Sequence, residues 1–294
     1  MEWKTRRIEA ILELALQEDK ATSDVTTALT VDPGLRATAT ILAKEECVLS
    51  GLGCLPRFLE IFARLDGKSS GRFEVVSHPE IFDGVRLRKG QAVAVIRHNA
   101  RVLLACERVM LNLMQRMSGI ATLTRRYVDE MHGTAARVLD TRKTIPGLRV
   151  LDKYSVRCGG GENHRLDLSD GILIKNNHIT LGGGIEKVLE RAKERRKPGQ
   201  TIDIEVRNFA ELEVALAHGA ESLLLDNMAP ADVKKCVERV REEGGKIPVE
   251  ASGGITLENI RKYALAGADY ISVGALTHSA TAVDLSMRIT AELY

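Results

Sequence analysis

The segment IDIEVRNFAELEVALAHGAESLLLDN, residues 202–227, contains one strand-helix-strand unit, and a second copy of the unit follows it along the chain. The segment begins with a short apolar run, continues with apolar residues at helical spacing and ends in a second apolar run. The stretch IPVEASGGITLENIRKYALAGADYISVG, residues 247–274, has the same layout, with Glu250 in the place of Glu205. Repeated units of this kind predict a parallel sheet flanked by helices.

The apolar runs of this pattern continue on the N-terminal side of the repeat. In order they are ARVLD, GILIK, TIDIEV, ESLLLD, IPVEAS and DYISVG. Within the two copies, Gly219 and Gly267 follow the helical segments, where a left-handed residue ends a helix. The series favours a (β/α) barrel, although a doubly wound open sheet uses the same units.

The first part of the chain has a different pattern. Residues 8–18 predict an amphipathic helix, and residues 100–132 predict a long one. Between them, Val- and Ile-rich stretches interrupted by glycines at positions 51, 71, 84 and 90 predict a mostly antiparallel sheet. The long helix carries a polar stripe of Arg101, Arg108, Asn112 and Gln115, whose first interpretation is a solvated face.

Composition limits the class of protein. The chain has 294 residues, 44% hydrophobic and 28% charged, with a formal net charge of +2, which indicates a globular protein and gives no reason to expect nucleic acid or a membrane as partner. No apolar segment approaches the roughly 20 residues that cross a bilayer, and the first residues do not resemble a signal peptide. The five cysteines form no CxxC pair, which is typical of reduced thiols. We therefore expect a cytoplasmic protein.

Polar residues follow the predicted strands, at the ends where a parallel barrel carries its active site. The first four strands end in Asp140, Thr141, Arg142 and Lys143, in Lys175, Asn176, Asn177 and His178, in Glu205, and in Asp226 and Asn227. The last two end in Ser252, Gly253 and Gly254 and in Val273 and Gly274. One polar strand end is ordinary, but six in succession are hard to explain by solubility alone.

These residue types indicate a substrate with several negative charges. Arginine binds carboxylate or phosphate through two parallel hydrogen bonds, and lysine supplies a compact charge; the cations concerned are Arg142, Lys143, Arg165 and Lys175. The glycine-containing ends allow backbone N–H groups to approach a phosphate. Glu205 and Asp226 would bind sugar hydroxyls, help to hold Mg²⁺ or stabilise a carbocation-like transition state. A phosphorylated sugar with an anionic co-substrate satisfies every part.

A set of motifs carries a family resemblance. They are SDVTT (23–27), ERVMLN (107–112), TRKT (141–144), GGGENHR (159–165), LIKNNH (173–178), IEV (204–206), LLDN (224–227), EASGGI (250–255) and SVGALTHS (272–279). In this order, across nearly the whole chain, they resemble the quinolinate phosphoribosyltransferases, also called nicotinate-nucleotide pyrophosphorylases (carboxylating). One departure is Asp167, where many relatives have glycine, and it concerns only the shape of the loop after His164 and Arg165.

The resemblance implies a reaction and a fold. Quinolinate and phosphoribosyl pyrophosphate would react with Mg²⁺ to give nicotinate mononucleotide, pyrophosphate and CO₂, a step toward NAD. The fold class would be α/β, with an N-terminal α+β sandwich-like domain over residues 1–118, joined by a C-terminal helix over 276–294, and an incomplete (β/α) barrel over 119–275. The working unit would be a homodimer in which Arg108 reaches the neighbouring site, with any higher assembly left open.

The resemblance also implies residue roles. Quinolinate would be bound by Arg108, Arg142, His164, Arg165 and Lys175. Lys143, Glu205 and Asp226 would face phosphoribosyl pyrophosphate, the two acids near the ribose hydroxyls and near Mg²⁺, directly or through water. The 5′-phosphate would be held by Ser252, Gly253, Gly254 and Gly274. Lys143, Lys175, Glu205 and Asp226 are the predicted catalytic residues, and His178 is expected to support its loop.

Two alternatives differ in chemistry. A phosphoribosyltransferase of nicotinate or another ring acid, without decarboxylation, would need fewer cations. A non-catalytic sugar-phosphate-binding protein on the same fold would tolerate the loss of Glu205 and Asp226 while retaining its ligand.

Overall fold

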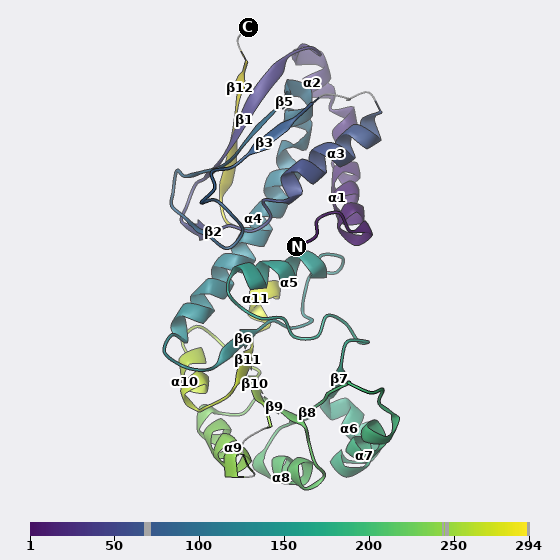
Figure 1. Ribbon diagram of the computed structural model, residues 1–294, viewed down its shortest axis with the longest axis vertical. Coiled ribbons are helices and arrows are strands. Elements are labelled where there is room, and N and C mark those ends of the chain that lie inside the picture. Colours follow the sequence, from purple (N-terminus) through teal and green to yellow (C-terminus); the bar gives the residue numbers. More distant parts are fainter. Residues whose placement is uncertain (68–71, 243, 245–246, 293–294) are drawn as a thin grey trace. The chain divides into compact units, whose positions relative to one another are not determined.

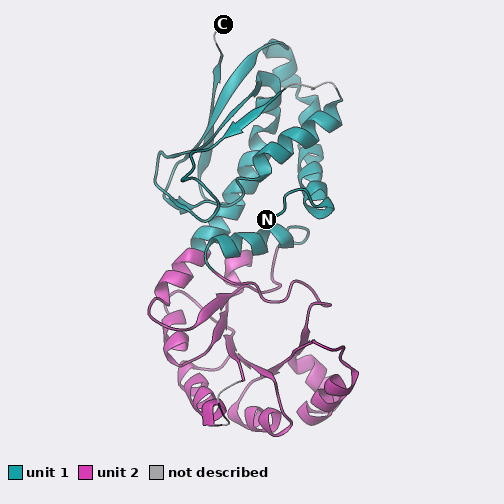
Figure 2. Cartoon of the chain, in the orientation of Figure 1, with its two compact units in different colours: residues 1–123, 145–160, 280–294 teal, residues 124–144, 161–279 magenta. Residues whose placement is uncertain are grey.

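A computed structural model describes residues 1–67, 72–242, 244 and 247–292 of the chain. The chain divides into two compact units (Figure 2). Unit 1 comprises residues 1–123, 145–160 and 280–294, and unit 2 comprises residues 124–144 and 161–279. No helix in these described stretches is long and apolar enough to cross a membrane.

Unit 1 contains a four-stranded antiparallel sheet in the order β12-β1-β5-β3 (Figure 1). The strands are β1 (Arg36–Ala43), β3 (Glu74–Val76), β5 (Ala92–Asn99) and β12 (Leu285–Ala291), and β2 (Cys47–Val48) pairs separately with β4 (Arg86–Leu87). The helices are α1 (Arg6–Glu18), η1 (Ala21–Ser23), α2 (Val25–Thr30), α3 (Cys54–Asp66), α5 (Arg149–Cys158) and the first part of α4 (Ala100–Glu130).

The core of unit 1 follows from the spacing of its apolar residues. Strand β1 alternates buried and partly exposed residues, so that Ile41 and its i±2 neighbours face the helices. Helix α1 buries Ile8, Leu12 and Leu16, one turn apart, and Thr5 caps its N-terminus. The predicted helices at 8–18 and 100–132 and the mostly antiparallel sheet are confirmed. The predicted break at Gly71 lies outside the described residues.

Two expectations about unit 1 are corrected. The predicted C-terminal helix over 276–294 is wrong: a four-residue helix, α11 (Ala275–His278), is followed by strand β12, which pairs antiparallel with β1. The reason is that Leu285, Met287 and Ile289 alternate with polar residues, which is a strand period. The expected boundary at 118/119 also differs from the observed division, because α4 continues to Glu130 and α5 belongs to unit 1.

Unit 2 is an incomplete α/β barrel. Its six parallel strands lie in the order β6-β11-β10-β9-β8-β7. They are β6 (Arg137–Leu139), β7 (Ile172–Ile174), β8 (Ile202–Val206), β9 (Ser222–Asp226), β10 (Val249–Ser252) and β11 (Tyr270–Ser272). The helices are α6 (Asn176–Gly182), α7 (Ile185–Arg195), α8 (Phe209–Ala217), α9 (Pro230–Glu242), α10 (Ile260–Leu265) and α11. Among the described residues no pairing joins β6 to β7, so the barrel does not close.

The repeat produces the expected units. Both copies form a strand, a helix and a strand, and Gly219 and Gly267 have φ of 68° and 93° after their helices. Helices α7 to α10 lie on the outer side of the strands (Figure 1). The C-terminal strand ends therefore remain open to carry polar side chains, as a parallel barrel requires.

Candidate active site

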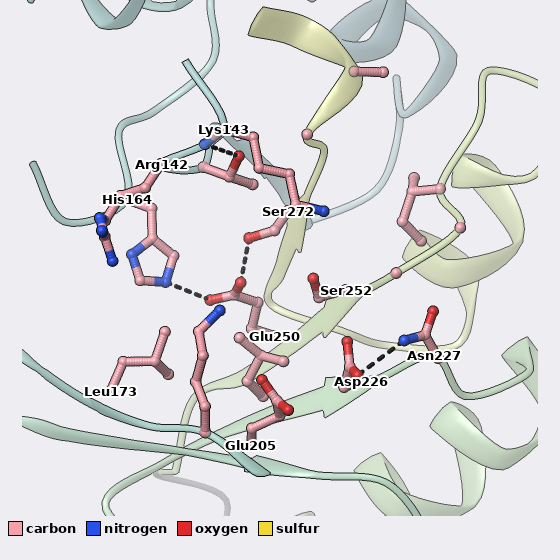
Figure 3. Close-up of a pocket in the computed structure, with 18 of the residues that line it drawn as sticks. Arg142, Lys143, His164, Leu173, Glu205, Asp226, Asn227, Glu250, Ser252 and Ser272 are labelled. Atoms are coloured by element: carbon pink, nitrogen blue, oxygen red, sulfur yellow. Dashed lines mark hydrogen bonds and ion pairs between the residues drawn. The ribbon is translucent and has the colours of Figure 1, made fainter. Parts of the chain in front are cut away.

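The C-terminal ends of the six strands surround a cavity of about 460 Å³ in unit 2 (Figure 3). It is lined by all but one of the predicted substrate residues: Arg142, Lys143, His164, Arg165, Lys175, Glu205, Asp226, Ser252, Gly253, Gly254 and Gly274. The exception is Arg108, which is exposed on α4 and does not line this cavity. The sequence pattern thus predicted a set of residues that the fold brings together.

Asp140 organises the segment that carries His164 and Arg165. It follows β6 and is fully buried, and its carboxylate accepts hydrogen bonds from the His164 backbone N–H at 2.9 Å and from Asn163 Nδ2 at 2.5 Å. Glu162 pairs with Leu139 in a parallel bridge, which brings the same segment alongside β6. Asp140 was expected only as a polar strand end, and its supporting role was missed.

Two arginines lie close together on this side of the cavity. Burial lowers the pKa of Arg165, the nearby Arg142 lowers it further, and Asp203 and Asp170 oppose the shift. Like charges in a partly desolvated site repel each other, and a bound dianion would relieve the repulsion. This geometry is suited to a ligand with two carboxylates.

Lys175 precedes α6, and its backbone N–H donates to His178 Nδ1 at 2.8 Å. His178 does not line the cavity. This hydrogen bond fits the expectation that His178 supports its loop.

Glu205 and Asp226 come from the neighbouring strands β8 and β9 and line the cavity. Ile202, Ile204 and Val206 are buried on one face of β8, so Glu205 points to the other face, toward the cavity. Glu205 Oε1 accepts from the Asn176 N–H at 3.3 Å, and Asp226 Oδ2 accepts from Asn227 Nδ2 at 2.9 Å. Two carboxylates on adjacent strands fit Mg²⁺, which is usually held by one or two carboxylates together with substrate phosphates.

The ends of β9 and β10 have an unusual backbone. Gly253 and Gly254 have φ of 93° and 63°, and Asn227 has φ of 54°. A Cβ atom on Gly253 would lie 2.3 Å from Asn227 Oδ1 and 2.9 Å from its backbone N. The Asn227 N–H donates to the Ser252 carbonyl at 2.8 Å, which locks the two strand ends together. Because Gly253 and Gly254 have no side chains, their backbone is open to a ligand on this side of the cavity, beside Ser252 and Asn227.

Glu250 and Ser272 line the cavity but were absent from the predicted set. Glu250 is 9% exposed, and Ser272 Oγ donates a short hydrogen bond to its Oε1 (Figure 3). The internal repeat contained a signal for Glu250, because it occupies the place of Glu205. No pattern singled out Ser272.

The polar stripe of α4 has mixed roles. Arg101 donates to the carbonyls of Val31 and Ala28, and Gln115 Nε2 donates to the Leu285 carbonyl at 2.9 Å. Arg108 and Asn112 are exposed. The solvated-face interpretation therefore holds only for the latter two within unit 1.

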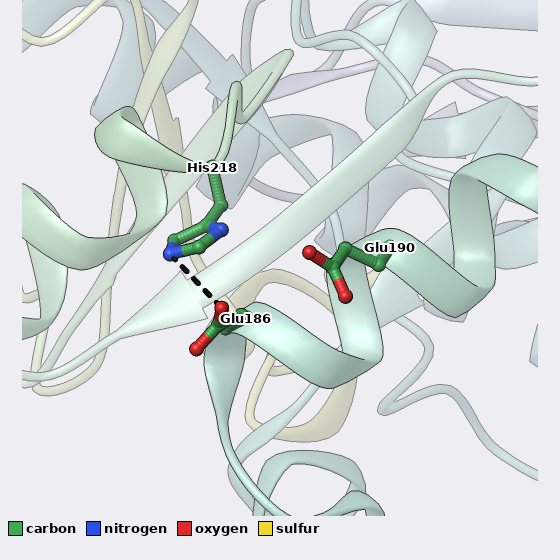
Figure 4. A group of neighbouring side chains, drawn as sticks. All are labelled: Glu186, Glu190 and His218. Carbon is green, nitrogen blue, oxygen red and sulfur yellow. Dashed lines mark ion pairs between the residues drawn. The ribbon is translucent and has the colours of Figure 1, made fainter.

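One group of side chains outside the cavity has atoms suited to metal binding. Glu186 and Glu190 on α7 and His218 after α8 have ligand atoms within 4.8 Å of one another, and His218 Nε2 lies 3.9 Å from Glu186 Oε1 (Figure 4). None of the three lines the cavity. Their exposure and the ion pair are those of an ordinary helix surface.

The fold and the cavity define a class of protein. Cations on one side, two carboxylates on neighbouring strands and glycine backbone at the last strand ends are the parts of an α/β-barrel enzyme acting on phosphorylated, anionic substrates.

Comparison with known proteins identifies the family. The model of the quinolinate phosphoribosyl transferase N-terminal domain matches residues 24–118, and that of the C-terminal domain matches residues 120–288. The chain belongs to the quinolinate phosphoribosyl transferase family.

Relatives match along nearly the whole chain. It is 41% identical to a nicotinate-nucleotide pyrophosphorylase [carboxylating] of Mycobacterium leprae, over 93% of this chain and 94% of the relative. It is 38% identical to a probable nicotinate-nucleotide pyrophosphorylase [carboxylating] of Bacillus subtilis, covering 97% and 94%. The crystal structure of NadC from Streptococcus pyogenes is similar with a TM-score of 0.88 and 36% identity, covering 97% of both chains.

Proposed function

We propose that this protein transfers the phosphoribosyl group of phosphoribosyl pyrophosphate to quinolinate and decarboxylates the product, giving nicotinate mononucleotide, pyrophosphate and CO₂ in NAD biosynthesis. The observation that carries the proposal is one cavity with two kinds of anion site, the cations near β6 and β7 and the glycine backbone of β10 and β11. Family membership supports the same reaction. The enzyme is a pentosyltransferase.

The residue roles divide along the cavity. Arg142, Arg165 and Lys175 bind the quinolinate carboxylates, with His164 on the same side. Lys143 meets the pyrophosphate, and the 5′-phosphate lies against the backbone at Ser252, Gly253, Gly254 and Gly274. Glu205 and Asp226 face the ribose hydroxyls and hold Mg²⁺ directly or through water.

The transfer step depends on position and charge. The cations orient quinolinate so that its pyridine nitrogen faces ribose C1. As the bond from C1 to pyrophosphate breaks, its electron pair leaves with pyrophosphate, and Lys143 stabilises that charge. Glu205 and Asp226 stabilise the positive charge developing at C1, to which the nitrogen then bonds. Mg²⁺ supplies charge neutralisation for the leaving pyrophosphate.

Decarboxylation needs no dedicated base in this mechanism. When the bond between C2 and its carboxyl group breaks, the electron pair stays on C2, beside the positively charged ring nitrogen, and C2 then takes a proton from water. A Lys175 or His164 variant that transferred the phosphoribosyl group but accumulated an undecarboxylated nucleotide would contradict this mechanism. Analysis of the products by mass spectrometry makes the test.

The choice of ring acid separates this function from its nearest alternative. In the presence of phosphoribosyl pyrophosphate and Mg²⁺, we expect the protein to form a nucleotide from quinolinate and none from nicotinate. Chromatography of the reaction products measures both. Nucleotide from nicotinate alone would indicate the non-decarboxylating transferase. If neither acid reacted, retention of phosphoribosyl pyrophosphate by a Glu205→Gln, Asp226→Asn double variant would indicate a binding protein.

The proposed working unit is a homodimer in which Arg108 serves the neighbouring site. Its support is that Arg108 is exposed on α4, where a second chain could reach it. Arg108→Ala and Arg165→Ala variants should each have little activity alone at a quinolinate concentration near the wild-type KM. When the two chains pair at random, the mixture should regain up to about one quarter of wild-type activity, because half of the dimers are mixed and each of these has one intact site. No recovery in dimers shown to be mixed would contradict the proposal.

The proposed compartment is the cytoplasm. All five cysteines are free thiols in the structure, which fits a reducing environment. Localisation of the tagged protein by microscopy would test this assignment.

A further inference from the structure

Glu250 occupies a buried place beside the cations of the active site. It lies on β10, opposite Tyr270 of the neighbouring strand β11, and lines the cavity. Its Oε1 accepts from Ser272 Oγ, and its Oε2 lies 3.4 Å from His164 Nε2 (Figure 3). A carboxylate that is 9% exposed requires such partners, since an unpaired buried charge is costly.

The hydrogen bonds of His164 determine its tautomer. Nδ1 accepts the backbone N–H of Arg165 at 2.7 Å, so in the neutral ring the proton is on Nε2. Nε2 then donates toward Glu250. The imidazole thus connects the carboxylate on β10 to the backbone of the residue whose guanidinium faces the cavity.

We propose that Glu250 is a positioning residue, which holds the His164 imidazole as the Nε2–H tautomer and thereby fixes the main chain of Arg165 for quinolinate binding. Both ring nitrogens face groups of the protein, so His164 acts through Arg165 and does not donate a hydrogen bond to a quinolinate carboxylate. Asp140 holds the same segment from the other side, through the His164 N–H. The inference rests on the proposed function and adds to it a residue that determines the affinity for the ring acid.

Three variants of Glu250 separate its contact from its charge. Glu250→Gln keeps an oxygen that can accept from Nε2–H but has no charge, and Glu250→Asp keeps the charge but withdraws the carboxylate by one methylene. Glu250→Ala removes both. We expect Glu250→Asp and Glu250→Ala to raise the KM for quinolinate about tenfold or more, because a small misplacement of binding groups is costly. The KM for phosphoribosyl pyrophosphate should change less than about threefold in these variants, and Glu250→Gln should keep both KM values near those of wild type.

A control variant tests for general effects of losing a carboxylate from unit 2. Glu213→Gln on α8 loses a partner of Arg239 but does not touch the cavity, and its kinetic constants should not change. Thermal unfolding of each variant shows whether it is folded. A uniform loss of kcat in the Glu250 variants, with both KM values unchanged, would contradict the positioning role.

A second measurement does not depend on turnover. In ¹⁵N-histidine NMR spectra, wild type and Glu250→Gln should show the Nε2–H tautomer of His164, whereas Glu250→Asp should show a mixture of both tautomers. This result would support the holding role even if wild type formed no nucleotide, a failure that would concern only the proposed function. An unchanged tautomer in folded Glu250→Asp, or a normal quinolinate KM for that variant with a raised one for Glu250→Gln, would overturn the proposal.

Discussion

At the scale of single residues, Arg165 shows how the site is prepared for an anion. Its guanidinium is partly buried and lies near the charge of Arg142, and both effects lower its pKa. The ligand-free protein thus contains a local electrostatic repulsion that a bound dicarboxylate would relieve. Perturbed pKa values of this kind are typical of functional sites.

Replacement of Arg165 should therefore separate binding from stability. We expect Arg165→Ala to raise the KM for quinolinate at least about tenfold, from the loss of charge-assisted hydrogen bonds. The melting temperature of the ligand-free variant should be equal to or above that of wild type, while its increase on addition of quinolinate should disappear. Arg191→Ala, which removes an exposed arginine of α7, is the control. A ligand-free Arg165→Ala protein that melted well below wild type would show that the arginine is structural.

At the scale of elements, the ends of β9 and β10 form a tight pair in which Gly253 has no room for a side chain. We expect Gly253→Ala to raise the KM for phosphoribosyl pyrophosphate more than the KM for quinolinate. Alanine is strained at the positive φ of this position and its Cβ would clash with Asn227, so the main chain proposed to bind the 5′-phosphate would move. Gly199→Ala is a matched control: its φ is 82°, but a Cβ would meet nothing within 4 Å. Equal effects of the two variants on substrate kinetics would contradict this role.

Helix α4 makes an equally close contact within unit 1. A Cβ atom on Gly119 would lie 2.1 Å from the carbonyl oxygen of Thr281. We expect Gly119→Ala to lower the free energy of unfolding by about 1–3 kcal/mol, since backbone must shift to admit the methyl group. Urea denaturation measures this change. An unaltered midpoint and slope of the unfolding transition would show that the segment before β12 can shift at little cost in free energy.

Most of the residues that line the cavity could be predicted from the sequence, because the end of a strand is a local feature of the chain. Arg142, Lys175, Glu205 and Asp226 directly follow or end their apolar runs, so parallel-barrel geometry alone places them together. The contact of Asp140 with His164 depends on the bridge between Leu139 and Glu162, and the contact of Glu250 with His164 depends on the order β6-β11-β10 of the sheet. The spacing of residues along the chain does not predict such contacts between distant segments. The C-terminal strand had a local signal in its alternation, but the resemblance favoured a helix there.

At the scale of the whole molecule, the thiols offer a test of how well the protein is packed. Burial raises the pKa of every cysteine, to about 11 for Cys47 and Cys236. At pH 8 the native protein should react slowly with a thiol reagent, and the protein unfolded in urea should expose all five thiols at once. Rapid native reaction of more than one thiol would contradict this packing.

The same shifts predict a pH dependence of stability. A thiol whose pKa is raised in the folded state stabilises the fold fully below its unfolded pKa, near 8.5, and loses that contribution as pH rises toward the folded value. We therefore expect the free energy of unfolding under reducing conditions to fall between about pH 8.5 and 11. Cys236→Ala, measured by urea denaturation, should reduce the slope of this decrease. A slope identical to that of wild type would contradict the assignment.

Transfer and decarboxylation in one active site are measured together by the ratio of products from quinolinate labelled in its 2-carboxyl group, with phosphoribosyl pyrophosphate and Mg²⁺ present. Labelled CO₂ and nicotinate mononucleotide should appear in equal amounts from the first turnovers. Nucleotide that retains the label would contradict the claim that one active site transfers the phosphoribosyl group and decarboxylates the ring.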